Sequence, residues 1–221
     1  MPRVVLVTGK GGVGKTTTAA ATAVRAARSG LRTLVMSTDA AHSLGDALDV
    51  DLRTARTWDD SHAVEPGLHA LAVGAHTAVE ADWQVVRDYL LGVLDAMGVD
   101  PVVADELTSL PGAEEVTALA ALALQTQRGQ WDLVVVDCAP TAETLRLLAL
   151  PEVLGWHLDR LLPAQRRLLT VLRPAASAAT GVPVPGPEVL LVLRAWRDLM
   201  VEVRTLLTSP RASVRVVLTP E

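Results

Sequence analysis

The sequence is poor in cysteine and in long apolar runs. Its single cysteine, Cys138, excludes an internal disulfide and any metal site built from several cysteines of one subunit. No apolar run approaches the roughly 20 residues that a membrane-spanning helix needs. The chain enters its first predicted strand without a signal peptide. We therefore expect a cytoplasmic protein that does not itself span a membrane.

Basic clusters are also missing. The net charge is −5 at pH 7, and no block of the chain concentrates the positive charges. Binding to nucleic acid through phosphate neutralisation is therefore disfavoured, and we expect no nucleic-acid partner. Half of the residues are hydrophobic and 20% are charged, which is typical of a globular protein. A chain of 221 residues is long enough to bury the core of one α/β domain.

What the sequence does contain is a glycine-rich loop between a strand and a helix. The apolar run at residues 4–7 predicts a buried strand, and the alanine-rich segment 18–28 predicts a helix closed by Gly30. The loop between them reads Gly9-Lys10-Gly11-Gly12-Val13-Gly14-Lys15-Thr16-Thr17. The spacing Gly-x4-Gly-Lys-Thr in this setting predicts a phosphate-binding loop.

Each residue type in this loop has a chemical reason. Glycines let successive N–H groups turn toward phosphate oxygens, and the helix N-terminus adds a partial positive charge. Lys15 would reach the β- and γ-phosphates, and the Thr16 hydroxyl would ligate Mg²⁺. All of residues 9–17 are therefore candidates for binding the nucleotide. A glycine-rich turn that binds nothing is the alternative.

Lys10 adds a second signal to the loop. The run Lys-Gly-Gly-Val-Gly-Lys-Thr-Thr resembles the deviant P-loop class of ATPases. In that class this lysine reaches across a dimer interface to the nucleotide of the partner. The resemblance therefore makes Lys10 a catalytic candidate together with Lys15, with a plain surface lysine as the alternative.

A second motif follows the strand predicted at residues 31–37. Ser-Thr-Asp-x-Ala-His-Ser-Leu-x-Asp-Ala resembles the arsenite-pump and tail-anchored-protein-targeting ATPases, although Ala40 stands where that family usually has proline. By this resemblance, and by its place at the carboxyl end of a strand, Asp39 would orient or deprotonate the attacking water. Asp39 would also contact the metal through water. Capping of a following helix is the alternative role.

A third motif ends the strand predicted at residues 131–137. Its last residue, Asp137, has the form of a Walker B aspartate and would hold a Mg²⁺-bound water opposite Thr16. The next residues resemble the second switch loop of the same family, with Cys138, Ala142 and Glu143 in place of Thr, Gly and His. These changes leave the rate of switching and turnover open. Cys138 is expected to be a small buried residue.

Periodicity predicts the remaining elements. Residues 50–66 are polar and turn-prone, residues 68–73 form an edge strand, and helices are predicted at 75–97, at 100–107 and from the turn at 111–112 to about residue 127. Glu114 and Glu115 at the start of that last helix resemble the family segment that faces the partner subunit. Simple complementarity with the helix dipole explains them equally well.

Residues 152–209 predict a helical subdomain. Segment 174–187 is rich in Pro, Ala, Ser and Gly and predicts a loop, and residues 187–207 carry apolar side chains at heptad spacing. The matching region of the tail-anchored-targeting ATPases forms a hydrophobic client groove, but ordinary packing on the sheet requires the same spacing. A final strand is predicted at 214–221. Because the family continues past this strand, we expect a truncated chain or one piece of a longer polypeptide.

Together the motifs predict one α/β P-loop NTPase domain over residues 1–221, with a helical insert. Its mainly parallel sheet would be flanked by helices and would hold the first, second, Walker B and C-terminal strands in its core. The resemblance implies ATP and Mg²⁺ as ligands, with hydrolysis at an interface with a second copy or a related paralogue. The preference for adenine depends on the resemblance alone.

The sequence leaves several processes that ATP hydrolysis could drive. The resemblance implies a conformational switch driven by turnover. The alternative is a chaperone or targeting module with little turnover, which would bind a hydrophobic protein client or a membrane-protein partner. Arsenite transport is disfavoured, because one cysteine cannot supply the several thiolates that soft As(III) requires.

Overall fold

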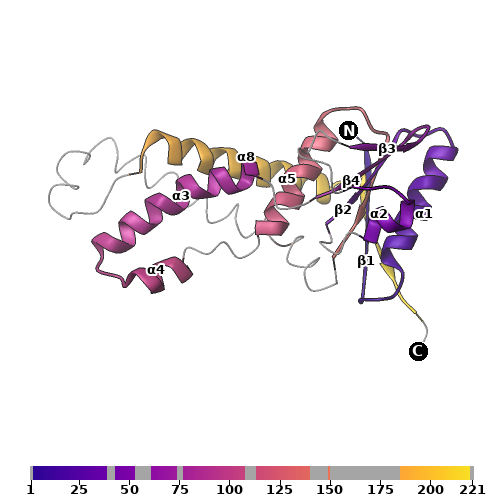
Figure 1. The fold of residues 1–221 in the computed structure, drawn as a ribbon. Coiled ribbons are helices and arrows are strands. Elements are labelled where there is room, and N and C mark those ends of the chain that lie inside the picture. Colours follow the sequence, from indigo (N-terminus) through magenta and orange to yellow (C-terminus); the bar gives the residue numbers. More distant parts are fainter. Residues whose placement is uncertain are drawn as a thin grey trace.

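The computed structural model of the chain describes residues 2–38, 43–52, 61–73, 77–107, 113–139, 149 and 185–219 (Figure 1). The strands are β1 (Arg3–Gly9), β2 (Thr33–Ser37), β3 (His62–Glu65), β4 (Leu68–Ala72), β5 (Leu133–Asp137) and β6 (Ala212–Val217). The helices are α1 (Lys15–Arg28), α2 (Ser43–Leu48), α3 (Thr77–Ala96), α4 (Pro101–Leu107), α5 (Ala113–Gln127) and α8 (Pro187–Leu207).

The six strands form one sheet in the order β3-β4-β2-β5-β1-β6. Neighbouring strands are parallel except for β3 and β4, which are antiparallel. Helices α1 and α2 cover one face of the sheet, and α5 and α8 cover the other (Figure 1). The predicted α/β fold, with a mainly parallel sheet flanked by helices, is confirmed.

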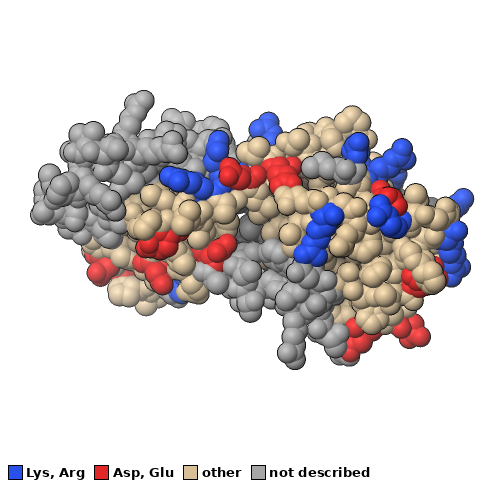
Figure 2. Space-filling view, turned by 90° about the horizontal axis from the view of Figure 1, so that it is seen from above, with Lys and Arg blue, Asp and Glu red and all other residues tan. Residues whose placement is uncertain are grey.

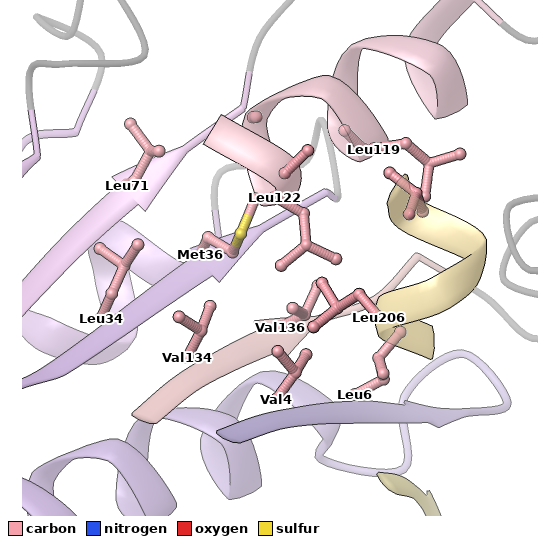
Figure 3. Packing of buried hydrophobic residues seen from close by; sticks show 14 of the residues in the cluster. Val4, Leu6, Leu34, Met36, Leu71, Leu119, Leu122, Val134, Val136 and Leu206 are labelled. Carbon is pink, nitrogen blue, oxygen red and sulfur yellow. The ribbon is translucent and has the colours of Figure 1, made fainter. Parts of the chain in front are cut away.

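The central strands are apolar because both of their faces are buried. All five residues of β2 and all five of β5 are buried. Alternate side chains point to opposite faces of the sheet. Val134 and Val136 pack with α5 and α8 (Figure 3), whereas Val135 packs with α1. Burial on both sides explains why these strands appear in the sequence as continuous hydrophobic runs.

Helices α3, α4 and α8 form a lobe that extends away from the sheet (Figure 1). Trp83 of α3 stacks on Trp196 of α8, with ring centroids 6.1 Å apart and planes inclined by 15°. Toward the sheet, α8 packs on α5 and buries Met200, Val203 and Leu206 in the core. The heptad spacing of this helix therefore serves internal packing along its buried face. No helix in the described part of the chain is both long and apolar enough to cross a membrane.

Four details differ from the sequence predictions. Residues 68–73 were expected to form an edge strand, but β4 lies inside the sheet because β3 pairs with its outer side. The first helix begins at Lys15 rather than residue 18, because Gly14 precedes it in the left-handed conformation with φ of 88°. Strand β3 lies in the segment expected to be turn-prone, since pairing with β4 defines it and its first two residues are exposed. Strand β6 lies at the edge of the sheet and not in its core. Of the helical subdomain predicted over residues 152–209, the part at 152–184 lies outside the described residues.

Candidate functional site

The three sequence motifs converge at the carboxyl edge of the parallel sheet. In the strand register Asp137 of β5 lies between Val7 of β1 and Ser37 of β2. The loops that follow these three strands therefore leave the sheet side by side. Open α/β sheets bind ligands at this edge. Asp39 and residues 140–148, which carry part of two motifs, lie outside the described residues.

The glycine-rich loop leaves open space where a phosphate group would bind. Gly12 and Gly14 have φ of 78° and 88°, a backbone conformation that side chains rarely tolerate. A Cβ atom added at Gly11, Gly12 or Gly14 would meet no other atom within 4 Å. The loop therefore fits a bulky anion close to its backbone, as a phosphate-binding loop requires.

Gly9 is glycine for a different reason. An added Cβ at this position would lie 2.4 Å from the carbonyl oxygen of Val217 in β6 and 3.1 Å from a methyl group of Val13. Its φ of 155° adds backbone strain for any other residue. Gly9 therefore allows β6 to pair closely with the end of β1.

The Lys15 side chain folds back over the loop. It is only 8% exposed, and its Nζ donates a hydrogen bond to the carbonyl oxygen of Lys10 at 3.3 Å. This bond connects the two ends of the loop segment 10–15. The ammonium group therefore lies against the backbone that would also bind a phosphate. A buried cation beside open backbone space is suited to an anionic ligand.

The other predicted residues of the loop differ in exposure. The backbone and side chains are exposed at Lys10, Gly11, Gly12, Gly14 and Thr17, whereas Val13 and Thr16 are half-buried. An exposed Lys10 is compatible both with a lysine that reaches a partner and with a plain surface lysine.

Oxygen donors lie where the sequence predicts a magnesium site. Asp137 is fully buried, and its Oδ2 accepts a hydrogen bond from the Ser37 hydroxyl at 3.5 Å. The Thr16 hydroxyl contacts the Ser43 hydroxyl at 3.4 Å. Carboxylate and hydroxyl oxygens suit Mg²⁺, which usually takes few protein ligands and completes its shell with water and substrate phosphates. The carboxylate of Asp137 and the hydroxyl of Thr16 therefore fit this mode of binding.

Thr38, which the sequence analysis did not single out, links two of the motifs. Its N–H donates to the carbonyl oxygen of Asp137 at 3.0 Å, and its hydroxyl reaches the same oxygen at 3.4 Å. The N–H of Ala139 in turn donates to the Thr38 hydroxyl at 3.2 Å. Thr38, which precedes Asp39, is therefore hydrogen-bonded to the backbone of the two residues that flank Cys138. A hydroxyl residue at the end of a parallel strand is the signal that could have indicated this role.

Cys138 is confirmed as a buried residue, 1% exposed within the core. The helix predicted after the turn at 111–112 is confirmed as α5, which begins at Ala113. The side chains of Glu114 and Glu115 lie outside the described part of the structure, so their proposed contact with a partner stays a prediction.

Comparison with known proteins gives the family. A sequence profile described as anion-transporting ATPase matches residues 2–221. The putative arsenical pump-driving ATPase of Chlorobaculum tepidum is 36% identical over 223 residues, covering 99% of this chain and 54% of that protein. The ATPase GET3B of Arabidopsis thaliana is 33% identical over 227 residues, covering 96% of this chain and 55% of that protein. The chain thus spans about half the length of these curated relatives, and it belongs to the anion-transporting ATPase family.

Proposed function

We propose that the chain is a Mg²⁺-dependent ATPase module that hydrolyses ATP at an interface with a second copy or a related paralogue. The observation that carries this proposal is the position of the buried Lys15 ammonium against an open glycine loop, at the edge where Asp137 also lies. The names of the relatives, arsenical pump-driving ATPase and ATPase GET3B, support the same chemistry. The activity would take place in the cytoplasm.

The residues divide the work as follows. The loop N–H groups and Lys15 bind and orient the phosphates, and Thr16 holds the metal. Mg²⁺ held there would neutralise the negative charge of the phosphate oxygens. Asp137 would help to hold the metal through water, and Asp39 would orient the attacking water. Lys10 supplies its charge to the nucleotide of the partner subunit.

The lysine content of the chain provides a direct binding test. Lys10 and Lys15 are the two lysines of the whole sequence. Labelling with an amine-reactive reagent, read out by peptide mass spectrometry, therefore reports on the loop and on the α-amino group alone. We expect MgATP to protect Lys15 strongly at any protein concentration. Protection of Lys10 should require the dimer and should therefore rise with protein concentration, in step with dimerisation measured by sedimentation.

Turnover is tested by Asp39→Asn. This substitution should leave ATP binding within about twofold of the parent and lower steady-state hydrolysis at least about 100-fold, because it removes a charge that acts on the water and not on the phosphates. Asp46→Asn, in the exposed part of α2, is the matched control and should hydrolyse ATP at the parent rate. Equal turnover in Asp39→Asn and the parent would contradict the role of Asp39. Absence of MgATP binding to the parent chain, measured by equilibrium titration, would contradict the nucleotide site itself.

A second candidate, a client-binding chaperone or targeting module, is favoured by apolar side chains on the lobe. Met97 after α3 is 67% exposed, Val102 of α4 is 69% exposed, and Leu191 of α8 is 65% exposed. Such a surface would suit a hydrophobic protein client or a membrane-protein partner. The test is binding of an apolar helical peptide to the chain with ATP, with ADP and without nucleotide. If the peptide binds equally to Val102→Glu and to the parent, the client site does not include the exposed surface at Val102.

Nucleic acid is not among the proposed partners. On the face seen in Figure 2, Lys and Arg side chains are interspersed with Asp and Glu side chains over the described residues. A phosphate backbone would meet both signs of charge on this face.

A further inference from the structure

We infer that Ser43 is a positioning residue that orients the metal-binding hydroxyl of Thr16. The inference rests on the proposed function, because Thr16 has a metal to hold only if the site binds MgATP. It assigns a role in metal binding to a residue outside the glycine-rich loop, at the start of α2. Its basis is the contact between the two hydroxyl oxygens, 3.4 Å apart.

The packing of α2 fixes Ser43 in this place. The next residue, Leu44, is fully buried in the cluster that also contains Ala19, Ala20 and Ala23 of α1. Gly45 then approaches the carbonyl oxygen of Val50 so closely that an added Cβ would lie 2.7 Å from it. The Leu44 side chain packs α2 against α1, and the close approach at Gly45 holds α2 against the segment that follows it. This packing places the Ser43 hydroxyl beside that of Thr16.

The chemistry of a metal-bound hydroxyl gives this contact a task. A threonine hydroxyl has one hydrogen and two lone pairs. When one lone pair faces a cation, the hydrogen points away from the metal and requires an acceptor. The Ser43 oxygen lies within reach and can accept. Because a cation withdraws electron density from the Thr16 oxygen, the hydrogen bond to Ser43 becomes stronger when metal is bound.

This coupling has a distinctive signature. A residue that only supports the fold would affect nucleotide binding equally with and without Mg²⁺. A residue that orients the metal ligand contributes mainly when Mg²⁺ is present. Outer hydrogen bonds to metal ligands typically change metal affinity by about 10- to 100-fold, and a single neutral hydroxyl is expected at the lower end of that range.

The experiment measures nucleotide affinity of the full chain in EDTA and across a Mg²⁺ titration, with ATP as the probe. In Ser43→Ala we expect the apparent affinity for Mg²⁺ in the ATP complex to fall about tenfold, while affinity for metal-free ATP stays within about twofold. Ser43→Thr keeps a hydroxyl and should restore the Mg²⁺ affinity. Thr22→Ala, which removes an exposed hydroxyl further along α1, is the matched control.

A double-mutant cycle assigns the effect to the pair. In a Thr16→Ala background, Ser43→Ala should have no further effect on the dependence of binding on Mg²⁺, whereas in Thr16→Ser the effect should persist. Equal losses with and without Mg²⁺, or additive losses in the double variant, would overturn the inference while leaving the nucleotide site intact. Absence of ATP binding by the parent chain would instead contradict the proposed function. Thermal unfolding of each variant shows that the fold is retained.

Discussion

At the amino edge of the sheet charged side chains pair at the surface, whereas at the carboxyl edge the charged side chains of Lys15 and Asp137 are buried. Arg32, just before β2, binds Asp132, just before β5, at 2.8 Å, and Arg28 of α1 binds Glu65 of β3 at 3.0 Å. These four side chains keep between 25% and 70% of their surface exposed. At the other edge Lys15 is 8% exposed and Asp137 is fully buried.

The difference indicates which edge is built for stability and which for function. Exposed ion pairs are screened by water and salt, so they can be lost with little effect on the fold. Burying a charge is costly, and such groups concentrate where a ligand needs them. Substitutions at the two edges should therefore have different effects. Substitutions at the carboxyl edge should have large effects that involve nucleotide binding or hydrolysis. Substitutions at the amino edge should have small effects that depend on pH and salt.

The largest effect is expected from Gly9→Ala, which tests how tightly the carboxyl edge is packed. The new Cβ would overlap the carbonyl oxygen of Val217 in a strained backbone conformation, and we expect a loss of about 3 kcal/mol in the free energy of unfolding. Gly11→Ala is the matched control, since it meets no atom within 4 Å and has no positive φ. Denaturant unfolding should show a change below about 0.5 kcal/mol for this control. Equal unfolding midpoints for the two variants would contradict the conclusion that packing requires a glycine at position 9 but not at position 11.

An intermediate effect is expected from Thr38→Val, which keeps the shape of the side chain and removes its hydroxyl. The hydrogen bond from the N–H of Ala139 to the Thr38 hydroxyl would be lost, at a cost of about 1–2 kcal/mol in unfolding free energy. Because the entry to the second switch loop loses this support, ATP hydrolysis should fall more than ATP binding. Thr38→Ser should restore both properties. If Thr38→Val hydrolyses ATP as fast as the parent, the hydrogen bonds of the Thr38 hydroxyl support stability alone.

The smallest effect is expected at the amino edge, from Asp132→Asn. Hydrogen bonds from the Arg32 side chain, and then from its backbone N–H, lower the pKa of Asp132 from its ordinary value of 3.8 to about 2. A carboxylate with a lowered pKa in the folded state stabilises the fold above pH 3.8, and this contribution disappears as the pH falls toward 2. Between pH 3.8 and about 2, the variant should therefore lose less stability than the parent. The measurement is the midpoint of urea unfolding at each pH. Nucleotide binding at pH 7 should not change, and a change would contradict the division between the edges.

Much of the fold was predictable because local patterns determine it. The continuous runs of β1, β2 and β5 reflect burial on both faces, and the glycine loop has a spacing that few other structures require. For the same reason the positions of Lys15 and Asp137 at one edge followed from the parallel order of the strands. The family assignment followed from residues 9–17 and from the segment that contains Asp39.

The rest could not be predicted because it depends on contacts between distant segments. Strand β3 exists through its pairing with β4, and β6 has an apolar sequence although Val216 is 60% exposed at the sheet edge. The links made by Thr38 and Ser43 join segments 99–101 and 27 residues apart, and no local spacing encodes them. Sequence motifs identified the groups expected to contact the nucleotide, while the groups that hold them in place required the structure.

The close approach of Val217 to Gly9 also affects what this motif reports in related sequences. The first glycine is usually counted as a mark of nucleotide binding, yet here a strand more than two hundred residues away in the chain requires it as well. A descendant that lost the ability to bind nucleotide would still keep Gly9 as long as it kept β6 beside β1. Gly11, which has open space around it and no positive φ, would be free to change in such a descendant. Preservation of Gly11 is therefore a better record of retained activity than preservation of Gly9.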